Sequence, residues 1–195
     1  MTRWPDIEPP ARDATPRPTL FLDRDGCLNV DRDYLADPAQ VELVPGAAGA
    51  LRRARAAGYR LIGVSNQSGL GRGRFARAEL DAVMTRLDEL LRAADAPLDA
   101  FYYCPHAPQD GCACRKPRTG LLDEAAREFF WDPARSWVIG DKVSDVDLAR
   151  AAGLRGILVL TGHGADERRR LVDREGVLVR PDLAAAIATA LEDRP

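Results

Sequence analysis

Two aspartates, Asp23 and Asp25, stand on either side of one arginine directly after the apolar run of residues 19–22. A further carboxylate, Asp141, follows the apolar run of residues 136–140. The carboxyl ends of neighbouring parallel strands meet at one edge of a sheet, where ligands bind. Asp23 and Asp141 would then form a hard oxygen site for Mg²⁺, because this ion takes one or two carboxylates together with phosphate oxygens.

Such a site indicates phosphoryl transfer. Asp23, held beside a phosphorus atom, can act as a nucleophile and form an aspartyl-phosphate. Asp25 can protonate the leaving oxygen and later activate water. A hydroxyl and an ammonium group can bind the equatorial oxygens, and Ser65 and Lys116 suit these two positions. Each motif alone also occurs as a polar turn or a helix cap, but their order along one expected sheet edge favours an active site.

Four cysteines occur in the chain, and three of them form with one histidine the pattern C-x-H-x5-C-x-C: Cys104, His106, Cys112 and Cys114. Three thiolates and one imidazole complete a tetrahedral zinc set, and a site closed by four protein ligands is structural. We expect Zn²⁺ to stiffen the loop that leads to Arg115 and Lys116. The alternative is a turn that gathers these side chains without metal.

Apolar runs alternate with amphipathic segments, which predicts an α/β fold: a Rossmann-like three-layer sandwich around a mostly parallel sheet. Strands are expected at 19–23, 59–65, 98–103, 136–140, 156–160 and 177–179, and helices at 46–57, 80–91, 121–130, 144–153 and 182–191. Thr119 is the expected cap of the helix at 121–130, and Ser144 with Asp147 the expected capping box of the next.

Domain organisation is expected to be simple. Residues 1–18 hold five of the fourteen prolines and predict a flexible tail, followed by one domain over 19–195. The separations of 42 positions from Asp23 to Ser65 and 51 from Ser65 to Lys116 leave no room for a cap domain.

Composition excludes several classes of protein. The chain has 28 basic and 30 acidic residues, a net charge of −2, so a nucleic-acid-coating protein is disfavoured. No apolar run approaches the roughly 20 residues that cross a bilayer, and the first residues lack the apolar core of a signal peptide. We expect a cytoplasmic protein that binds neither nucleic acid nor membrane. No heptad pattern indicates self-association, so a monomer is expected.

The segments FLDRDGCLN, SNQSG, RKP and GDKVSD resemble the four motifs of the haloacid dehalogenase-like phosphohydrolases, over about residues 19–160. This resemblance implies a Mg²⁺-dependent phosphatase in which Asp23 is the nucleophile and Asp25 the acid/base. Ser65 and Lys116 would stabilise the transferring group. Mg²⁺ would be held by Asp23, the backbone carbonyl of Asp25, and Asp141.

The cysteine loop is similar to that of two groups within this superfamily, which act on D-glycero-D-manno-heptose 1,7-bisphosphate and on histidinol phosphate. Arg115 and Lys142 are similar to substrate-contacting residues of the first group. Two such cations suit a doubly phosphorylated sugar, from which the 7-phosphate would be removed, better than a cationic amino alcohol. The implied substrate-binding residues are Asp31, Arg32, Asp33, Tyr34, Asn66, Gln67, Ser68, Arg115 and Lys142. Asp33 stands where the heptose enzymes tend to have glycine, which leaves the anomer open.

Three alternatives stay open: a histidinol-phosphate phosphatase, a polynucleotide 3′-phosphatase, and a zinc module that binds nucleic acid or protein with merely structural carboxylates. The near-neutral charge disfavours the polynucleotide enzyme. Arg72 and Arg74 either contact a distal phosphate or are solvated. His163, between two glycines, is expected to have a loop role rather than a catalytic one.

Overall fold

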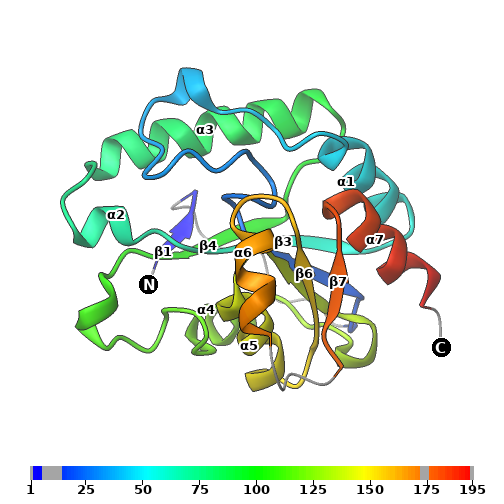
Figure 1. Ribbon diagram of the computed structural model, residues 1–195. Coiled ribbons are helices and arrows are strands. Elements are labelled where there is room, and N and C mark those ends of the chain that lie inside the picture. Colours follow the sequence, from blue (N-terminus) through cyan, green and yellow to red (C-terminus); the bar gives the residue numbers. More distant parts are fainter. Residues whose placement is uncertain (1, 6–14, 172–175, 194–195) are drawn as a thin grey trace.

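The computed structural model describes residues 2–5, 15–171 and 176–193 of the chain. These residues form a seven-stranded sheet of order β1-β4-β3-β2-β5-β6-β7, in which all neighbours run parallel except β1 and β4 (Figure 1). The strands are β1 (Thr2–Trp4), β2 (Thr19–Leu22), β3 (Arg60–Asn66), β4 (Ala100–Cys104), β5 (Trp137–Gly140), β6 (Arg155–Val159) and β7 (Leu178–Arg180).

Helices cover both faces of this sheet. The α-helices are α1 (Ala47–Ala56), α2 (Ser68–Gly71), α3 (Arg77–Ala93), α4 (Gly120–Ala125), α5 (Val143–Ala151), α6 (Gly164–Glu167) and α7 (Leu183–Glu192). Short 3₁₀ turns are η1 (Pro38–Gln40), η2 (Pro108–Asp110), η3 (Pro133–Arg135) and η4 (Arg168–Arg170).

Alternation along the strands separates two apolar layers. Leu20, Leu22 and Ile139 belong to the core under α1, α3 and α7. Phe21 and Val138, one position away in the same strands, belong to the core under α4 and α5. The arrangement in Figure 1 is therefore the predicted three-layer α/β sandwich with a mostly parallel sheet.

The segments between the strands are short. From Asp23 to Ser65 the chain forms η1 and α1 before β3, and from Ser65 to Lys116 it forms α2, α3, β4 and η2. No cap domain is inserted in either of these fully described segments. Among the described residues, no helix is both long and apolar enough to cross a bilayer.

Part of the segment expected as a flexible tail belongs to the sheet. Thr2–Trp4 pair antiparallel with β4, Arg3 lies 2.9 Å from Glu128 through Nε and Oε2, and Trp4 packs against the core. The expectation was wrong for these residues because β4 otherwise presents an unpaired edge, which a short strand covers. Residue 1 and residues 6–14 lie outside the described part.

Two local helix predictions were also wrong. The helix expected at 121–130 ends at Ala125, after which Arg127 N and Glu128 N donate to carbonyls only three residues back, those of Glu124 and Ala125, each at 3.1 Å. The chain then leaves the helical path, and the Phe130 carbonyl accepts from Arg17 N at 3.1 Å. Thr119 makes no side-chain cap there. Helix α5 starts at Val143, and Asp145 rather than Asp147 accepts the Lys142 backbone N–H, at 3.1 Å.

A pair of glycine substitutions tests the central packing. A Cβ at Gly63 in β3 would collide with the Phe101 ring, whereas at Gly49 in α1 the nearest atom, Arg53 Nη1, lies 3.9 Å away. We expect Gly63→Ala to lower the free energy of unfolding by about 1–3 kcal/mol. Gly49→Ala should raise it by about 0.5–1 kcal/mol, since it removes a helical glycine. Urea unfolding measures both, and an unchanged midpoint for Gly63→Ala would contradict the packing.

Candidate active site

A cavity of about 230 Å³ opens at the carboxyl ends of the central strands. Asp23 follows β2, Ser65 lies at the end of β3, and Asp141 follows β5, so the order of the strands brings these three side chains together. Sequence-predicted residues that line the cavity are Asp23, Asp25, Asp31, Asp33, Tyr34, Ser65, Asn66, Gln67, Ser68, Arg115, Lys116 and Lys142.

Lys116 holds the floor of this cavity together. Its buried Nζ lies 3.0 Å from Asp23 Oδ1 and 2.5 Å from Asp145 Oδ1, and it donates to the carbonyl of Val64 at 2.8 Å. Burial by itself lowers the pKa of a lysine, but Asp145 and Asp23 outweigh it and raise the pKa of Lys116. Burial likewise opposes ionisation of Asp23, and the charges of Lys116 and Lys142 lower its pKa in net. Asp23 therefore stays an ionised carboxylate.

Three buried carboxylates crowd this floor. Asp23, Asp141 and Asp145 each offer one oxygen within 4.8 Å of the others. Burial, then the neighbouring carboxylates, raise the pKa of Asp141 to about 7. A divalent cation would remove this repulsion and suits an all-oxygen ligand set. Asp23 and Asp141, the two carboxylates expected to hold Mg²⁺, both belong to this group, and Asp145 adds a third carboxylate that also pairs with Lys116.

Asp25 sits beside this group, and several donors fix its carboxylate. Arg24 Nη2 and Nε lie 2.7 and 3.0 Å from its two oxygens, and Asn29 Nδ2 donates to it at 3.1 Å. Gln67 Nε2 donates to both Asp25 Oδ2 at 3.1 Å and Ser65 Oγ at 3.0 Å. Gln67 therefore ties the expected acid/base to the expected phosphate-binding hydroxyl.

Two predicted substrate-binding residues have other contacts. Arg32 does not line the cavity, and its Nη2 donates to Glu42 Oε2 at 2.9 Å on the exposed surface, so its contact with substrate stays a prediction. Asn66 lines the cavity, but its amide is used by the backbone of Lys116. Its Oδ1 accepts from Lys116 N at 3.0 Å and its Nδ2 donates to Lys116 O at 3.2 Å. Asn66 thus clamps the residue that carries the buried ammonium group.

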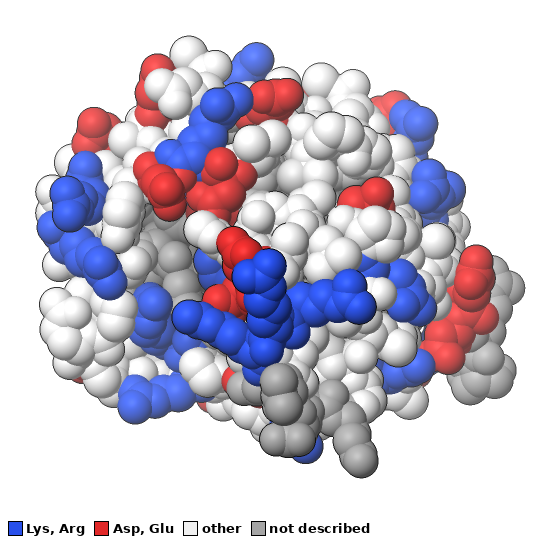
Figure 2. All heavy atoms as spheres, viewed as in Figure 1, with Lys and Arg blue, Asp and Glu red and all other residues white. Residues whose placement is uncertain are grey.

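The outer part of the cavity carries mixed charge. Arg115 Nη1 is buried and has no hydrogen-bond partner among the described residues, which suits it to an anionic ligand. Lys142 and the acidic Asp31 and Asp33 line the same opening. Figure 2 shows acidic and basic side chains intermingled around the hollow on this face, rather than one basic field.

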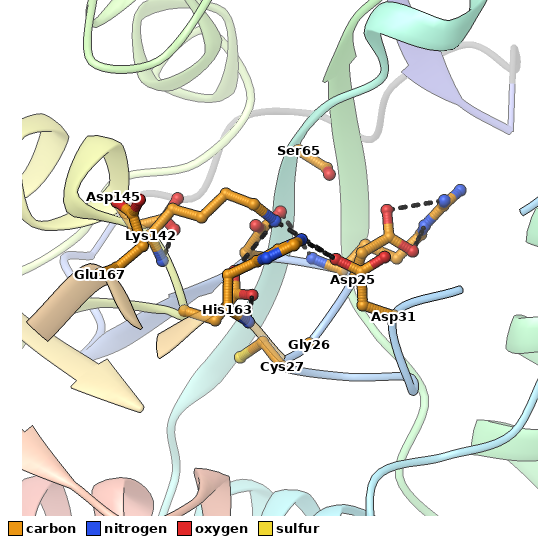
Figure 3. A network of polar contacts seen from close by, with 12 residues as sticks. Asp25, Gly26, Cys27, Asp31, Ser65, Lys142, Asp145, His163 and Glu167 are labelled. Atoms are coloured by element: carbon orange, nitrogen blue, oxygen red, sulfur yellow. Dashed lines mark hydrogen bonds and ion pairs between the residues drawn. The ribbon is translucent and has the colours of Figure 1, made fainter. Parts of the chain in front are cut away.

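Several lining residues were not predicted. His163 was expected to have a loop role, yet it lines the cavity (Figure 3). Its backbone N–H donates to Asp141 Oδ2 at 2.8 Å. Arg24, Phe75 and Ser144 also line the cavity, although none of them was predicted as a site residue. For His163, the sequence signal was the glycine before it. Gly162 has φ +56°, and a Cβ there would collide with Asp141, so this loop must lie close to the site.

The cysteine loop forms a compact four-atom cluster. Cys104 Sγ lies 3.5 Å from Cys112 Sγ, Cys114 Sγ lies 3.6 Å from Cys112 Sγ, and His106 Nδ1 lies 3.6 and 3.3 Å from Cys104 and Cys114 Sγ. These separations are far longer than the about 2.05 Å of a disulfide. They approach the roughly 3.7 Å edge of a tetrahedron with Zn–S bonds of about 2.3 Å. The predicted set fits zinc.

The chain has relatives along most of its length. It is 36% identical over 177 residues to the D-glycero-beta-D-manno-heptose-1,7-bisphosphate 7-phosphatase of Pseudomonas aeruginosa, a match that covers 90% of this chain and 99% of that one. It is 45% identical over 160 residues to the D-glycero-D-manno-heptose-1,7-bisphosphate 7-phosphatase of Thermosynechococcus vestitus, covering 76% and 82%. A family model described as HAD-hydrolase-like matches residues 113–186.

A solved structure of a heptose bisphosphate phosphatase is also similar to this chain. The D,D-heptose 1,7-bisphosphate phosphatase of Bordetella bronchiseptica, solved with magnesium and phosphate, superposes with a TM-score of 0.84 at 36% identity and covers 90% of this chain and 99% of that one. The sequence motifs, the α/β sandwich and these relatives agree. The chain belongs to the haloacid dehalogenase-like phosphatases, in the family of the D-glycero-D-manno-heptose-1,7-bisphosphate 7-phosphatases.

Proposed function

We propose that this chain removes the 7-phosphate of D-glycero-D-manno-heptose 1,7-bisphosphate in a Mg²⁺-dependent hydrolysis. The observation that carries this proposal is the buried Lys116–Asp23 contact of 3.0 Å at the floor of a cavity that Arg115 and Lys142 also line. The floor suits the phosphate that reacts. The two further cations suit the second phosphate of the substrate named for the relatives.

The first step transfers the phosphoryl group to the protein. An oxygen of Asp23 attacks phosphorus, the bond to the sugar oxygen breaks, and Asp25 donates a proton to that leaving oxygen. Ser65 Oγ and Lys116 Nζ stabilise the charge that develops on the phosphoryl oxygens. The donors around Asp25, Gln67 above all, hold it at the leaving-group side.

The second step releases phosphate. Asp25, now ionised, takes a proton from water, and the hydroxide oxygen attacks the phosphorus of the aspartyl-phosphate. The bond to Asp23 breaks and the Asp23 carboxylate is restored, so atoms and protons balance. Asp23, Asp141 and the backbone carbonyl of Asp25 would hold Mg²⁺, which supplies charge neutralisation and orientation of the phosphate when bound.

The zinc cluster has a structural role in this proposal. Cys114 directly precedes Arg115 and Lys116, so fixing the cysteine loop fixes the two cations that follow it. Burial raises the pKa of Cys104 to about 12, and a bound Zn²⁺ would supply the charge that keeps such a thiol ionised. Function as a cytoplasmic monomer, without nucleic acid or membrane, stays a prediction.

Removing the nucleophile tests the mechanism. Asp23→Asn should lower kcat with Mg²⁺ by about 10³-fold or more, because an amide cannot form the acyl-phosphate. Phosphate release measures this loss, and thermal unfolding checks that the variant is folded. Asp166→Asn is the control, since the Asp166 side chain is 84% exposed and does not line the cavity. Residual turnover near the wild-type rate would overturn the nucleophile assignment.

A substrate panel tests the specificity. It holds both anomers of the heptose 1,7-bisphosphate, histidinol phosphate and a 3′-phosphorylated oligonucleotide. We expect one heptose anomer to lead in kcat/KM by at least about tenfold, or about 1.4 kcal/mol of transition-state discrimination. Asp33 has φ +39° in the loop where the resemblance places glycine, so this loop is where the anomer preference is expected to lie. A lead for histidinol phosphate would keep the mechanism and reject the heptose substrate.

Metal analysis tests the cysteine cluster. The wild-type protein should bind one Zn²⁺ per chain, and Cys112→Ser should lose it together with about 10- to 100-fold of kcat, because Arg115 and Lys116 are displaced. Cys27→Ala is the matched control, since Cys27 is buried elsewhere and should leave the zinc content unchanged. Wild-type protein free of zinc, with reduced cysteines, would contradict the prediction.

A further inference from the structure

His163 is fixed in place by its own backbone. It follows Gly162, whose φ of +56° and missing side chain let the loop after β6 lie against Asp141. The His163 N–H donates to Asp141 Oδ2 at 2.8 Å. Because the donor is a backbone N–H, we expect substitutions other than proline to keep this support of the expected metal ligand.

The imidazole ring reaches the loop on the other side of the cavity. His163 Nε2 lies 3.2 Å from Asp31 Oδ2, and Figure 3 shows the ring directed at Asp31 beside the end of Lys142. The Asp31 side chain is 15% exposed, and its Oδ1 accepts the N–H of Asp33 at 3.1 Å. Both oxygens of Asp31 therefore have protein partners. We expect its carboxylate to organise this loop rather than to bind substrate directly.

Lys142 is shared between two acidic groups. Its Nζ lies 3.5 Å from Asp31 Oδ2 and 3.2 Å from Asp141 Oδ1. An ammonium group has three donors, so two such contacts leave one for a ligand oxygen. The position of Asp31 therefore decides how far Lys142 is drawn away from a ligand, and His163 holds Asp31.

We infer that His163 is a positioning residue for substrate recognition: it anchors Asp31 and thereby sets Lys142 toward the phosphate on the leaving group. This inference rests on the proposed function, because it needs a substrate with anionic or hydroxyl groups on the leaving side. His163 takes no part in the bond-breaking steps. Without its ring, Asp31 loses one of its two partners at Oδ2 and pairs more closely with Lys142.

The test separates binding from chemistry. Steady-state kinetics on the heptose bisphosphate and on p-nitrophenyl phosphate, which has one phosphate and no sugar, are measured for wild type, His163→Ala, Asp31→Asn and the double variant. We expect His163→Ala to raise KM for the bisphosphate about 5- to 20-fold while kcat changes less than about threefold. The loss of kcat/KM on p-nitrophenyl phosphate should be at least fivefold smaller.

Two further variants sharpen the test. His163→Gln keeps a donor that can reach Asp31 and should recover part of the lost affinity. Arg169→Ala, an 84% exposed position in the same segment, is the control and should match wild type. The double variant should match Asp31→Asn alone, because His163 acts only through the Asp31 carboxylate. Additive losses, a fall in kcat at constant KM, or equal losses on both substrates would each overturn the inference.

The activity of the wild-type protein separates the hypothesis about the substrate from the hypothesis about His163. Failure of wild type on the heptose bisphosphate would reject the proposed substrate. The same variant ratios would then be taken on the best substrate of the panel, and they would support or overturn the positioning role of His163 by the same criteria.

Discussion

The site depends on the buried ion pairs that the Lys116 ammonium group makes with Asp23 and Asp145. An ion taken out of water is costly unless its partners are close, and here Asp23, Asp145 and the Val64 carbonyl surround it at 3.0, 2.5 and 2.8 Å. Burial opposes ionisation of Asp23, but the charges of Lys116 and Lys142 lower its pKa and keep it ionised, as a nucleophile requires. Structure and reactivity are therefore coupled: removing one member of this group leaves another charged and buried without its partner.

This arrangement constrains the segments that deliver its members. Asp145 contacts the ammonium group and also accepts the N–H that begins α5, so one carboxylate joins the helix start to the floor of the cavity. Lys116 comes from the cysteine loop, and the Asn66 amide holds its backbone on both sides. The end of β3, the start of α5 and the cysteine loop therefore all contact Lys116.

The outer part of the site is more exposed than its floor. Its walls are loops, and Tyr34 is 42% exposed with φ +57°, close to Arg72 and Arg74. Arg72 donates to the Tyr34 hydroxyl at 3.2 Å, and Arg74 lies over the ring, so in this structure both arginines support a loop. The floor of the cavity is therefore built from buried charged groups, whereas this part of its wall is an exposed loop.

The amino-acid sequence was enough to predict the fold class, the four motifs at one sheet edge and the candidate zinc ligands in the pattern C-x-H-x5-C-x-C. It could do so because apolar alternation, carboxylates at strand ends and cysteine spacing are local patterns. It did not determine that Thr2–Trp4 complete the sheet, that Arg32 turns to Glu42, that Asn66 serves Lys116, or that His163 faces Asp31. Those contacts join residues that are far apart in the chain, or they involve side chains that can point either into the cavity or toward the surface. Only the packing of strands and loops against one another decides which partner each side chain meets.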